Sequence, residues 1–380
     1  MERLKVLLAF GTRPEGIKLA PVIREMMNRP DDFQVSVCDT GQHKEMLAPI
    51  LRFFDIKPDY NLEIMSHNQT LSNVCSSIIK ELDKVLDKDK PDIMVVQGDT
   101  ATTLSAALVS YFRKIPIAYV EAGLRTGDIF SPFPEEANRK MVSAVSNWQF
   151  APTELSAEAL LGEGYKSNNI HIVGNTAIDA IKIAKGLLDL EGIYVPDQFN
   201  FLSDEKKMVL ITGHRRENFG EIMDGIVTAF AELARENPEV HFIYPVHLNP
   251  NVQKVVKERL QKISNFHLFS PQPYDLFVWL MMRSYIIITD SGGIQEEAPS
   301  LNKPVIVTRS TTERMEAIDA GACELAGTNG KDIICHVNRL LVDSDRYKEM
   351  AKAVNPFGDG QTAVRICDIL LQDKDKLKNG

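Results

Sequence analysis

Residues 4–27 read LKVLLAFGTRPEGIKLAPVIREMM, and this order predicts a strand, a glycine-containing turn and a helix. The apolar run 4–10 is short and β-rich, whereas residues 17–27 form an amphipathic stretch of helical length. A strand that is apolar along most of its length is typical of βαβ units around a parallel sheet.

The same alternation continues along the whole chain. Further strands are predicted at 35–40, 93–97, 117–121 and 148–152, and then at 208–212, 240–246, 266–269, 285–289 and 304–308. Helices are predicted between them, among others at 68–86, 101–111, 219–236 and 252–263. Two series of five strands indicate an α/β protein with two similar lobes. The length of 380 residues agrees, because it exceeds what one hydrophobic core usually serves.

Composition excludes several classes of protein. The chain is 44% apolar and 25% charged, as expected for a globular protein, and its formal net charge of -9 argues against non-specific nucleic-acid binding. Its five cysteines form no C-x-x-C pair, so they predict neither a zinc ribbon nor a disulfide framework. No apolar stretch approaches the roughly 20 residues that span a bilayer. We therefore expect a cytoplasmic protein without a membrane partner.

The turn at residues 11–18, GTRPEGIK, has some features of a phosphate site. A complete P-loop is absent, because no Ser or Thr follows Lys18, and there is no G-x-G-x-x-G fingerprint for a dinucleotide. Backbone N–H groups at a helix start, together with Arg13 and Lys18, could still bind an anion. A plain strand-to-helix turn with solvated charges explains these residues equally well.

Carboxylates follow two of the predicted strands. Asp99 comes after strand 93–97 and Glu121 ends strand 117–121, so both should lie at one edge of the sheet. Glu135 and Glu136 begin a helix, where acidic residues are also expected as partners of the helix dipole. That explanation does not apply to Asp99 and Glu121. Carboxylates gathered in a cleft are suited to removing and returning a proton.

The second half carries its own strand-end motifs. His214 and Arg215 directly follow strand 208–212, which suggests an anion clamp in which His214 could also donate a proton. Residues 289–297 read TDSGGIQEE, where Gly292 and Gly293 permit close backbone approach to a phosphate. Glu297 could accept hydrogen bonds from ribose hydroxyls.

Two further histidines lie at strand exits. His43 follows strand 35–40 and could line a cleft between the lobes, and His247 follows strand 240–246. No pair of histidines has zinc-site spacing, so we expect no metal.

Twelve sequence blocks, taken together and in order, resemble the bacterial non-hydrolysing UDP-N-acetylglucosamine 2-epimerases. They are FGTRPEGIKLAP, QHKEML, QGDTATT, VEAGLRTGD, PEEANR, FAPTE, GNTAIDA, GHRREN, YPVHLNPNV, TDSGGIQEEAPSL, TTER and NPFGDG. The resemblance implies a glycosyltransferase-B-like architecture, with two Rossmann-like domains facing a central cleft and a last helix that crosses back to the first domain. The expected domains are 1–172 plus 362–380 and 173–361, and the family suggests a homodimer.

The resemblance also assigns roles to residues. UDP would bind mainly to the second domain, with uracil near Gln272 and Phe277, phosphate at Ser291, Gly292 and Gly293, and ribose at Glu297. The diphosphate cradle would be completed by Arg13, Lys18, His214 and Arg314. The acid and base groups would be Asp99, Glu121 and Glu135, held by Arg139. The implied reaction interconverts UDP-N-acetylglucosamine and UDP-N-acetylmannosamine without a cofactor, through elimination of UDP to 2-acetamidoglucal, and supplies precursors for surface polysaccharide.

Some members of this family are activated by a second substrate molecule. The matching positions here are Gln42, His43, Gln69, Glu136, Arg215 and His247, whereas Asn68 stands where regulated members commonly have arginine. Allosteric activation is therefore a hypothesis.

Three other functions share the expected fold. A hydrolysing epimerase would release UDP and free N-acetylmannosamine, and a glycosyltransferase would need an acceptor and leave the carbon 2 hydrogen in place. A nucleotide-sugar sensor would have no use for three carboxylates together.

Overall fold

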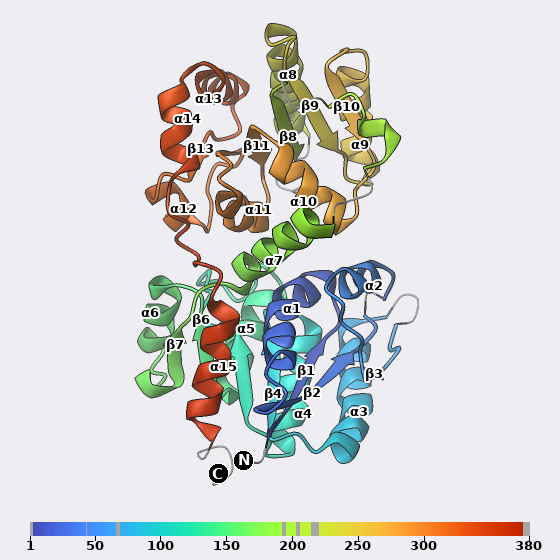
Figure 1. Cartoon of the computed structure of the whole chain (residues 1–380), viewed down its shortest axis with the longest axis vertical. Coiled ribbons are helices and arrows are strands. Elements are labelled where there is room, and N and C mark those ends of the chain that lie inside the picture. Colours follow the sequence, from blue (N-terminus) through green and yellow to red (C-terminus); the bar gives the residue numbers. More distant parts are fainter. Residues whose placement is uncertain are drawn as a thin grey trace. The chain divides into compact units, whose positions relative to one another are not determined.

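The computed structural model describes residues 3–42, 44–65, 69–191, 195–202, 206–213 and 220–374. The chain forms two compact units, of which the first comprises the residues up to Ala180 together with those from Phe357 onwards. The second comprises Ile181–Pro356 (Figure 1). The first unit ends at residue 180 instead of the expected 172, and it resumes at residue 357 instead of 362.

The first unit contains a parallel sheet with the strand order β3-β2-β1-β4-β5-β6-β7. Its strands are β1 (Leu4–Phe10), β2 (Phe33–Asp39), β3 (Tyr60–Asn61), β4 (Ile93–Gln97), β5 (Ile117–Val120), β6 (Trp148–Ala151) and β7 (Ile170–Ile172). Its helices are α1 (Arg13–Met27), α2 (Lys44–Phe53), α3 (Leu71–Asp89), α4 (Ala101–Phe112), α5 (Glu135–Val145), α6 (Glu154–Gly162), the short η1 (Ser167–Asn169) and α15 (Thr362–Gln372). Helix α7 (Thr176–Glu191) begins in this unit and continues into the second.

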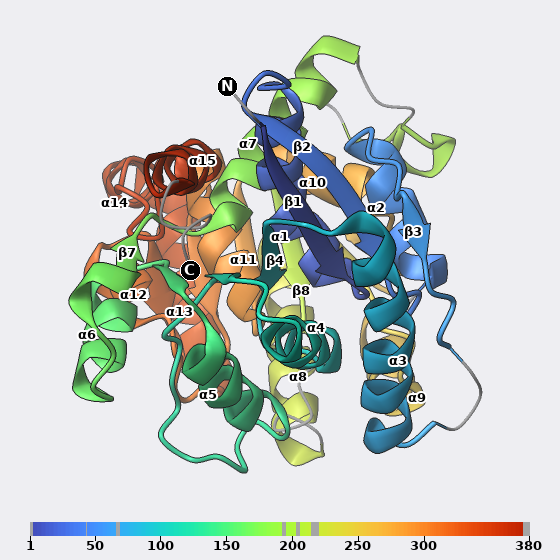
Figure 2. The same cartoon turned by 90° about the horizontal axis from the view of Figure 1, so that it is seen from below.

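Helices cover both faces of this sheet, which is why its central strands are almost continuously apolar. On one face, Leu7 and Ala9 of β1 belong to a buried cluster with Ile78 and Leu82 of α3. Helices α3, α4 and α5 follow one another on this side, as Figure 2 shows. Helix α1 packs against α2 and α15.

Helix α15 confirms the expected return of the last helix to the first unit. Its residues Ile366, Cys367 and Leu370 are fully buried. Asp368 forms an ion pair with Arg29 of α1 (Oδ1 to Nη1, 2.5 Å). Helix α15 belongs to the first unit (Figure 1). Its apolar face is part of the core of that unit.

The second unit repeats the architecture with the strand order β10-β9-β8-β11-β12-β13, again parallel. Its strands are β8 (Met208–Thr212), β9 (His241–Pro245), β10 (Phe266–Phe269), β11 (Ile286–Thr289), β12 (Val305–Val307) and β13 (Cys323–Leu325). Its helices are η2 (Asp197–Phe199), α8 (Glu221–Glu236), α9 (Pro250–Leu260), α10 (Tyr274–Arg283), α11 (Gly292–Glu297), η4 (Ala298–Leu301), α12 (Met315–Asp319), α13 (Gly330–Val342) and α14 (Ser344–Ala351).

The prediction of an α/β protein with two Rossmann-like domains is confirmed, but the prediction of five strands in each is wrong. The described sheets have seven and six strands. The additional strands β3, β7 and β13 have only two or three residues each and lie at sheet edges. Strands this short carry no apolar run that could identify them.

Two helix starts also differ from the prediction. Helix α1 begins at Arg13 rather than at residue 17, because Thr12 is an extended N-cap and a proline fits the first helical turn. Helix α3 begins at Leu71 rather than at residue 68, because the Thr70 side chain accepts a hydrogen bond from the N–H of Asn73.

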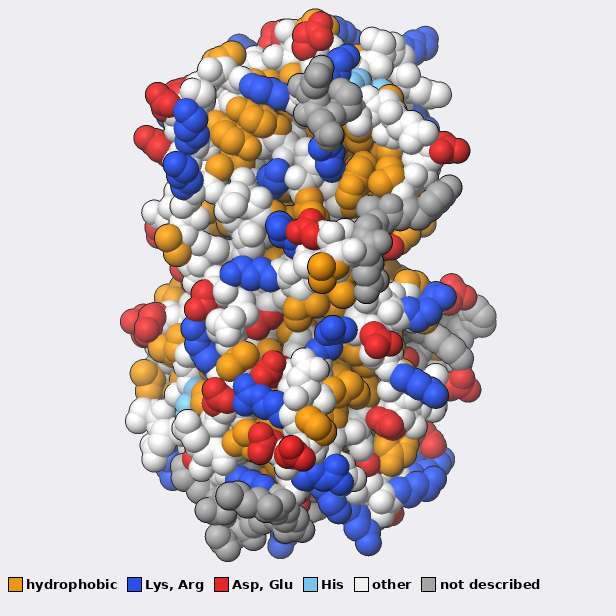
Figure 3. Space-filling model, in the orientation of Figure 1, with side chains coloured by type: hydrophobic (Ala, Val, Ile, Leu, Met, Phe, Trp, Pro, Cys, Tyr) orange, Lys and Arg blue, Asp and Glu red, His pale blue; other side chains and the backbone are white. Residues whose placement is uncertain are grey.

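Within the described part of the chain, no helix is both long and apolar enough to cross a membrane. On the face drawn in Figure 3, lysine and arginine side chains alternate with acidic ones in each unit.

Candidate functional site

Polar residues gather where strands β1, β4 and β5 of the first unit end. These three strands are parallel neighbours, so their carboxyl ends lie side by side along the same end of the sheet. The chain leaves β1 at Gly11, β4 at Gly98 and β5 at Glu121. This end of the sheet therefore brings together the two motifs that the sequence indicated as a phosphate turn and a carboxylate cluster.

Glu121 lies directly after β5 in the left-handed backbone region (φ 67°) and is buried. Its Oε1 forms an ion pair with Nζ of Lys18 at 2.5 Å. Its other carboxylate oxygen accepts a hydrogen bond from the side-chain amide of Gln97, the last residue of β4. Lys18, expected as a phosphate ligand, is thus also the cation that faces Glu121.

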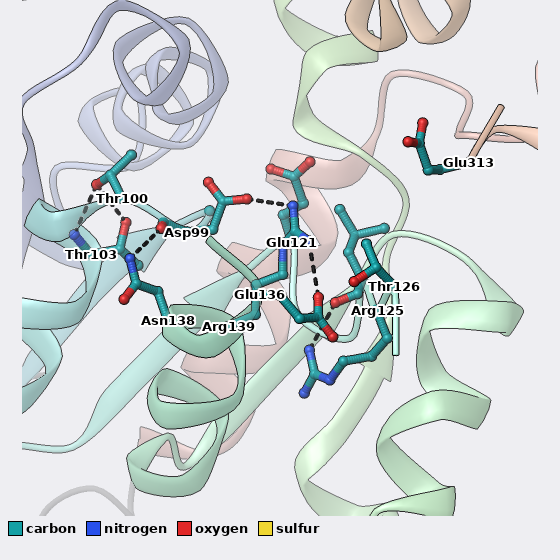
Figure 4. Close-up of polar contacts among 12 residues, drawn as sticks. Asp99, Thr100, Thr103, Glu121, Arg125, Thr126, Glu136, Asn138, Arg139 and Glu313 are labelled. Atoms are coloured by element: carbon teal, nitrogen blue, oxygen red, sulfur yellow. Dashed lines mark hydrogen bonds and ion pairs between the residues drawn. The ribbon is translucent and has the colours of Figure 1, made fainter. Parts of the chain in front are cut away.

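Asp99 is held by α5 (Figure 4). The Arg139 guanidinium contacts Oδ2 of Asp99 at 2.5 Å and Oε2 of the fully buried Glu136 at 3.2 Å. Asn138 donates a hydrogen bond to the backbone carbonyl of Asp99 (2.8 Å). Burial disfavours the charge of Arg139, but its two carboxylate partners raise its pKa overall. Of the three carboxylates that Arg139 was expected to hold, these contacts include only Asp99, and the second partner is Glu136 rather than Glu121 or Glu135.

Two site candidates keep their charge available for a ligand. Glu135 is half-buried in the first turn of α5, and Arg13 is half-buried in the first turn of α1. Neither side chain has a hydrogen-bonding or ionic partner among the residues that the structure describes.

Sequence reasoning missed Glu15, a buried carboxylate in the first turn of α1. It accepts hydrogen bonds from the backbone N–H groups of Gly11 and Thr12 and lies within hydrogen-bonding distance of the hydroxyls of Thr100 and Thr103. The local signal was present, because Thr12 followed by Glu three residues later is the capping-box pattern. No local sequence pattern predicts the contacts of Glu15 with Thr100 and Thr103 at the start of α4.

In the second unit, the β11 to α11 turn gathers the expected phosphate residues. The N–H of Ser291 donates to the Thr289 hydroxyl (3.0 Å). A Cβ placed on Gly292 would lie 3.1 Å from Cζ of Arg314, so only glycine fits without displacing that side chain. Arg314 itself forms an ion pair with the buried Glu296 (Nη2 to Oε1, 2.8 Å). This cation, expected at a diphosphate, therefore has a carboxylate partner as well.

The other residues expected at the nucleotide occupy the same unit. A Cβ on Gly293 would lie 4.0 Å from Oε1 of Glu297, which places that carboxylate beside the glycine turn. Phe277 is half-buried in α10. Gln272 lies just before this helix, and its amide donates to the carbonyl of Ser270 (2.5 Å).

The residues matched to a second, activating site are dispersed over both units. Gln42 accepts a hydrogen bond from Thr102 (3.0 Å), and Gln69 donates to the carbonyl of Ile64 (2.9 Å). His247 is exposed and accepts the N–H of Asn249 at Nδ1 (3.2 Å). Two more of these candidates, His43 and Arg215, lie outside the described residues, as does His214, which was expected at the diphosphate.

No group of three or more His, Cys, Asp or Glu side chains in the described ranges is placed to hold a metal ion.

Comparison with known proteins gives one consistent result. The family model described as UDP-N-acetylglucosamine 2-epimerase matches residues 25–371. A Yersinia pestis UDP-N-acetylglucosamine 2-epimerase is 49% identical over 371 residues, which covers 97% of this chain and 98% of that protein. The Escherichia coli K12 protein of the same name is 46% identical, with coverage of 98% and 99%.

Solved structures agree with these relatives. The Neisseria meningitidis UDP-GlcNAc 2-epimerase bound to UDP-GlcNAc superposes with a TM-score of 0.89 at 46% identity, covering 97% of this chain and all of that one. The Methanocaldococcus jannaschii enzyme in complex with UDP-GlcNAc and UDP has a TM-score of 0.76 at 35% identity, with coverage of 97% and 100%.

Proposed function

The chain belongs to the UDP-N-acetylglucosamine 2-epimerase family and is an isomerase, and we propose that it interconverts UDP-N-acetylglucosamine and UDP-N-acetylmannosamine by eliminating and re-adding UDP. The observation that carries this proposal is the placement of Asp99 and Glu121 at adjacent strand ends, with Glu135 at the start of α5.

The proposed order of events follows from the acidity of the sugar. The hydrogen on carbon 2 has no adjacent carbonyl, so direct removal would be prohibitively slow. When the bond from carbon 1 to UDP breaks, the ring gains oxocarbenium character and this hydrogen becomes acidic. A carboxylate can then remove it, which gives 2-acetamidoglucal and UDP. Return of a proton to the opposite face, and of UDP to carbon 1, completes the inversion.

Two arginines, one in each unit, carry a charge that suits the leaving group. Arg13 has no partner among the described residues, and Arg314 lies against the Gly292 turn. Preorganised donors of this kind stabilise a developing anion by a few kcal/mol each. We assign the diphosphate to Arg314 and Ser291 in the second unit, and a role of Arg13, Lys18 and His214 at the diphosphate stays a prediction. Relatives bound to UDP-GlcNAc and to UDP support a nucleotide sugar as the substrate.

Solvent exchange tests the proposal. The protein is incubated with UDP-N-acetylglucosamine in D2O, and the carbon 2 hydrogen is followed by proton NMR while phosphorus NMR follows UDP. We expect deuterium at carbon 2 of both epimers without net release of UDP. Net release with free N-acetylmannosamine would indicate the hydrolysing reaction instead, and an unchanged carbon 2 hydrogen, with substrate shown to be bound, would refute the proposal.

A further inference from the structure

Glu15 is a buried carboxylate that the proposed reaction does not use. It lies in the first turn of α1, and only 1% of its surface is exposed. Its Oε2 accepts the backbone N–H groups of Gly11 (3.0 Å) and Thr12 (2.8 Å). This oxygen therefore shapes the turn that leads from β1 into α1, the helix that carries Lys18.

The other oxygen of Glu15 contacts residues that follow the neighbouring strand β4. Its Oε1 lies 2.5 Å from the hydroxyl of Thr100 and 3.0 Å from that of Thr103, both at the start of α4. Thr100 directly follows Asp99, and the Thr103 hydroxyl also lies 2.6 Å from the backbone carbonyl of Gln97. One side chain thus joins the turn after β1 to the turn after β4.

Both turns hold partners of the same reacting group. Lys18, one helical turn after Glu15, forms an ion pair with one oxygen of Glu121, and the Gln97 side chain binds the other. We infer that Glu15 is a positioning residue. It fixes the distance between the start of α1, which carries Lys18, and the turn at residues 97–99. It thereby sets the orientation of the Glu121 and Asp99 side chains. This inference rests on the proposed function, because it concerns the same carboxylates.

The number of hydroxyl protons available around Glu15 indicates which replacement of this residue should be tolerated. The Thr103 hydroxyl has one proton, and an ionised Glu15 would compete for it with the carbonyl of Gln97. A neutral Glu15 can donate to Thr103, which then donates to Gln97, so every group is satisfied. Burial raises the pKa of Glu15, although hydrogen bonds from Thr100 and the backbone oppose this. A glutamine has the same length and can donate in the same direction.

The test compares Glu15→Ala, Glu15→Asp and Glu15→Gln, with Asp92→Asn as a matched control. Asp92 also joins β1 to β4, since it accepts the N–H of Lys5 (2.8 Å), but it does so at the opposite edge of the sheet. The readouts are kcat for deuterium exchange at carbon 2, UDP affinity by calorimetry, and Tm.

We expect Glu15→Ala and Glu15→Asp to lower kcat by roughly a hundredfold, because displacement of reacting groups by about 1 Å has an effect of that size. UDP affinity should fall much less than kcat, because the nucleotide residues of the second unit are untouched, although the α1 turn also carries Arg13 and Lys18. Glu15→Gln should restore most of kcat, and Asp92→Asn should leave kcat unchanged even where it lowers Tm.

Wild-type kcat in well-folded Glu15→Asp, whatever its Tm, would overturn the inference and leave Glu15 a purely structural residue. Equal losses in the Gln and Asp variants would overturn it too. If Glu15→Ala does not fold, the comparison of Asp with Gln decides. A wild-type protein that does not exchange carbon 2 would refute the proposed function instead, so the two failures are distinguishable.

Discussion

Arg139 balances the charge of a carboxylate that has no access to solvent. Glu136 is 0% exposed, and Arg139 is its cationic partner as well as that of Asp99. Removing one partner of a buried ion pair typically costs about 3–5 kcal/mol, because the other charge stays buried. We therefore expect Arg139→Met to lower the free energy of unfolding by this amount in urea titrations at pH 7.

Arg113 offers the control for that change. It pairs with Asp83 and Asp87 on the surface, where an ion pair contributes about 1 kcal/mol or less. Arg113→Met should therefore have a small effect. Adding Glu136→Gln to Arg139→Met should restore much of the lost stability, and a double variant as unstable as the single one would contradict this account.

His267 should make stability depend on pH. It stacks on Phe201, and its Nε2 lies 3.1 Å from Nδ1 of His241. Burial, and then the charge of His241, lower the pKa of His267 to about 4. Between pH 6.5 and pH 4 the unfolded chain therefore binds a proton that the folded protein does not, so stability falls as the pH falls through this range.

Allowing for the partial exposure of this imidazole, we expect a loss of about 1 kcal/mol between pH 7 and pH 5. The measurement is urea unfolding of the wild type and His267→Asn over this range. The variant should show a shallower dependence, and equal slopes would show that other groups cause the effect.

Of the contacts among the candidate site residues, the family resemblance predicted that of Arg139 with Asp99, but the sequence did not predict the others. Asp99 and Glu121 could be placed at one sheet edge because each follows an apolar strand. The Lys18 contact with Glu121 joins residues 103 positions apart, and Glu15 meets Thr100 across 85 positions. Contacts of this kind depend on the register of β1 and β4, which no local pattern encodes.

At the scale of elements, α15 provides the strongest test of packing. Ile366 is fully buried, so Ile366→Ala should lower the free energy of unfolding by about 2–5 kcal/mol. Asp368→Ala in the same helix removes only the partly exposed bridge to Arg29 and should cost about 1 kcal/mol or less. Chemical denaturation of both variants measures this difference. Equal effects would mean that the ion pair, rather than the apolar face, attaches the helix.

Central strands were easier to predict than edge strands because central strands are buried along their length. Strands β1, β4, β8 and β11 are buried on both faces and form apolar runs. Strands β3 and β7 are partly exposed, β13 is mostly buried, and all three have only two or three residues, too few to show a pattern. Burial therefore leaves a signal in the sequence only where an element is covered along its length.

For the whole molecule, the repeated strand series predicted two units, and the two groups of site residues divide between them. The carboxylates Asp99 and Glu121 belong to the first unit, whereas Ser291, Gly292 and Glu297 belong to the second. If this division reflects function, chemistry and nucleotide affinity should be separable by mutation.

That separation can be measured by ligand-dependent stability. UDP at a hundred times its Kd should stabilise the wild-type protein by about 2.7 kcal/mol. Asp99→Asn should keep this stabilisation while it lowers carbon 2 exchange by about a hundredfold or more, the usual contribution of an acid–base group. Glu297→Ala should instead weaken the UDP effect, because its carboxylate lies beside the Gly293 turn. Loss of UDP stabilisation in Asp99→Asn, in proportion to its loss of turnover, would place this carboxylate in binding rather than in catalysis.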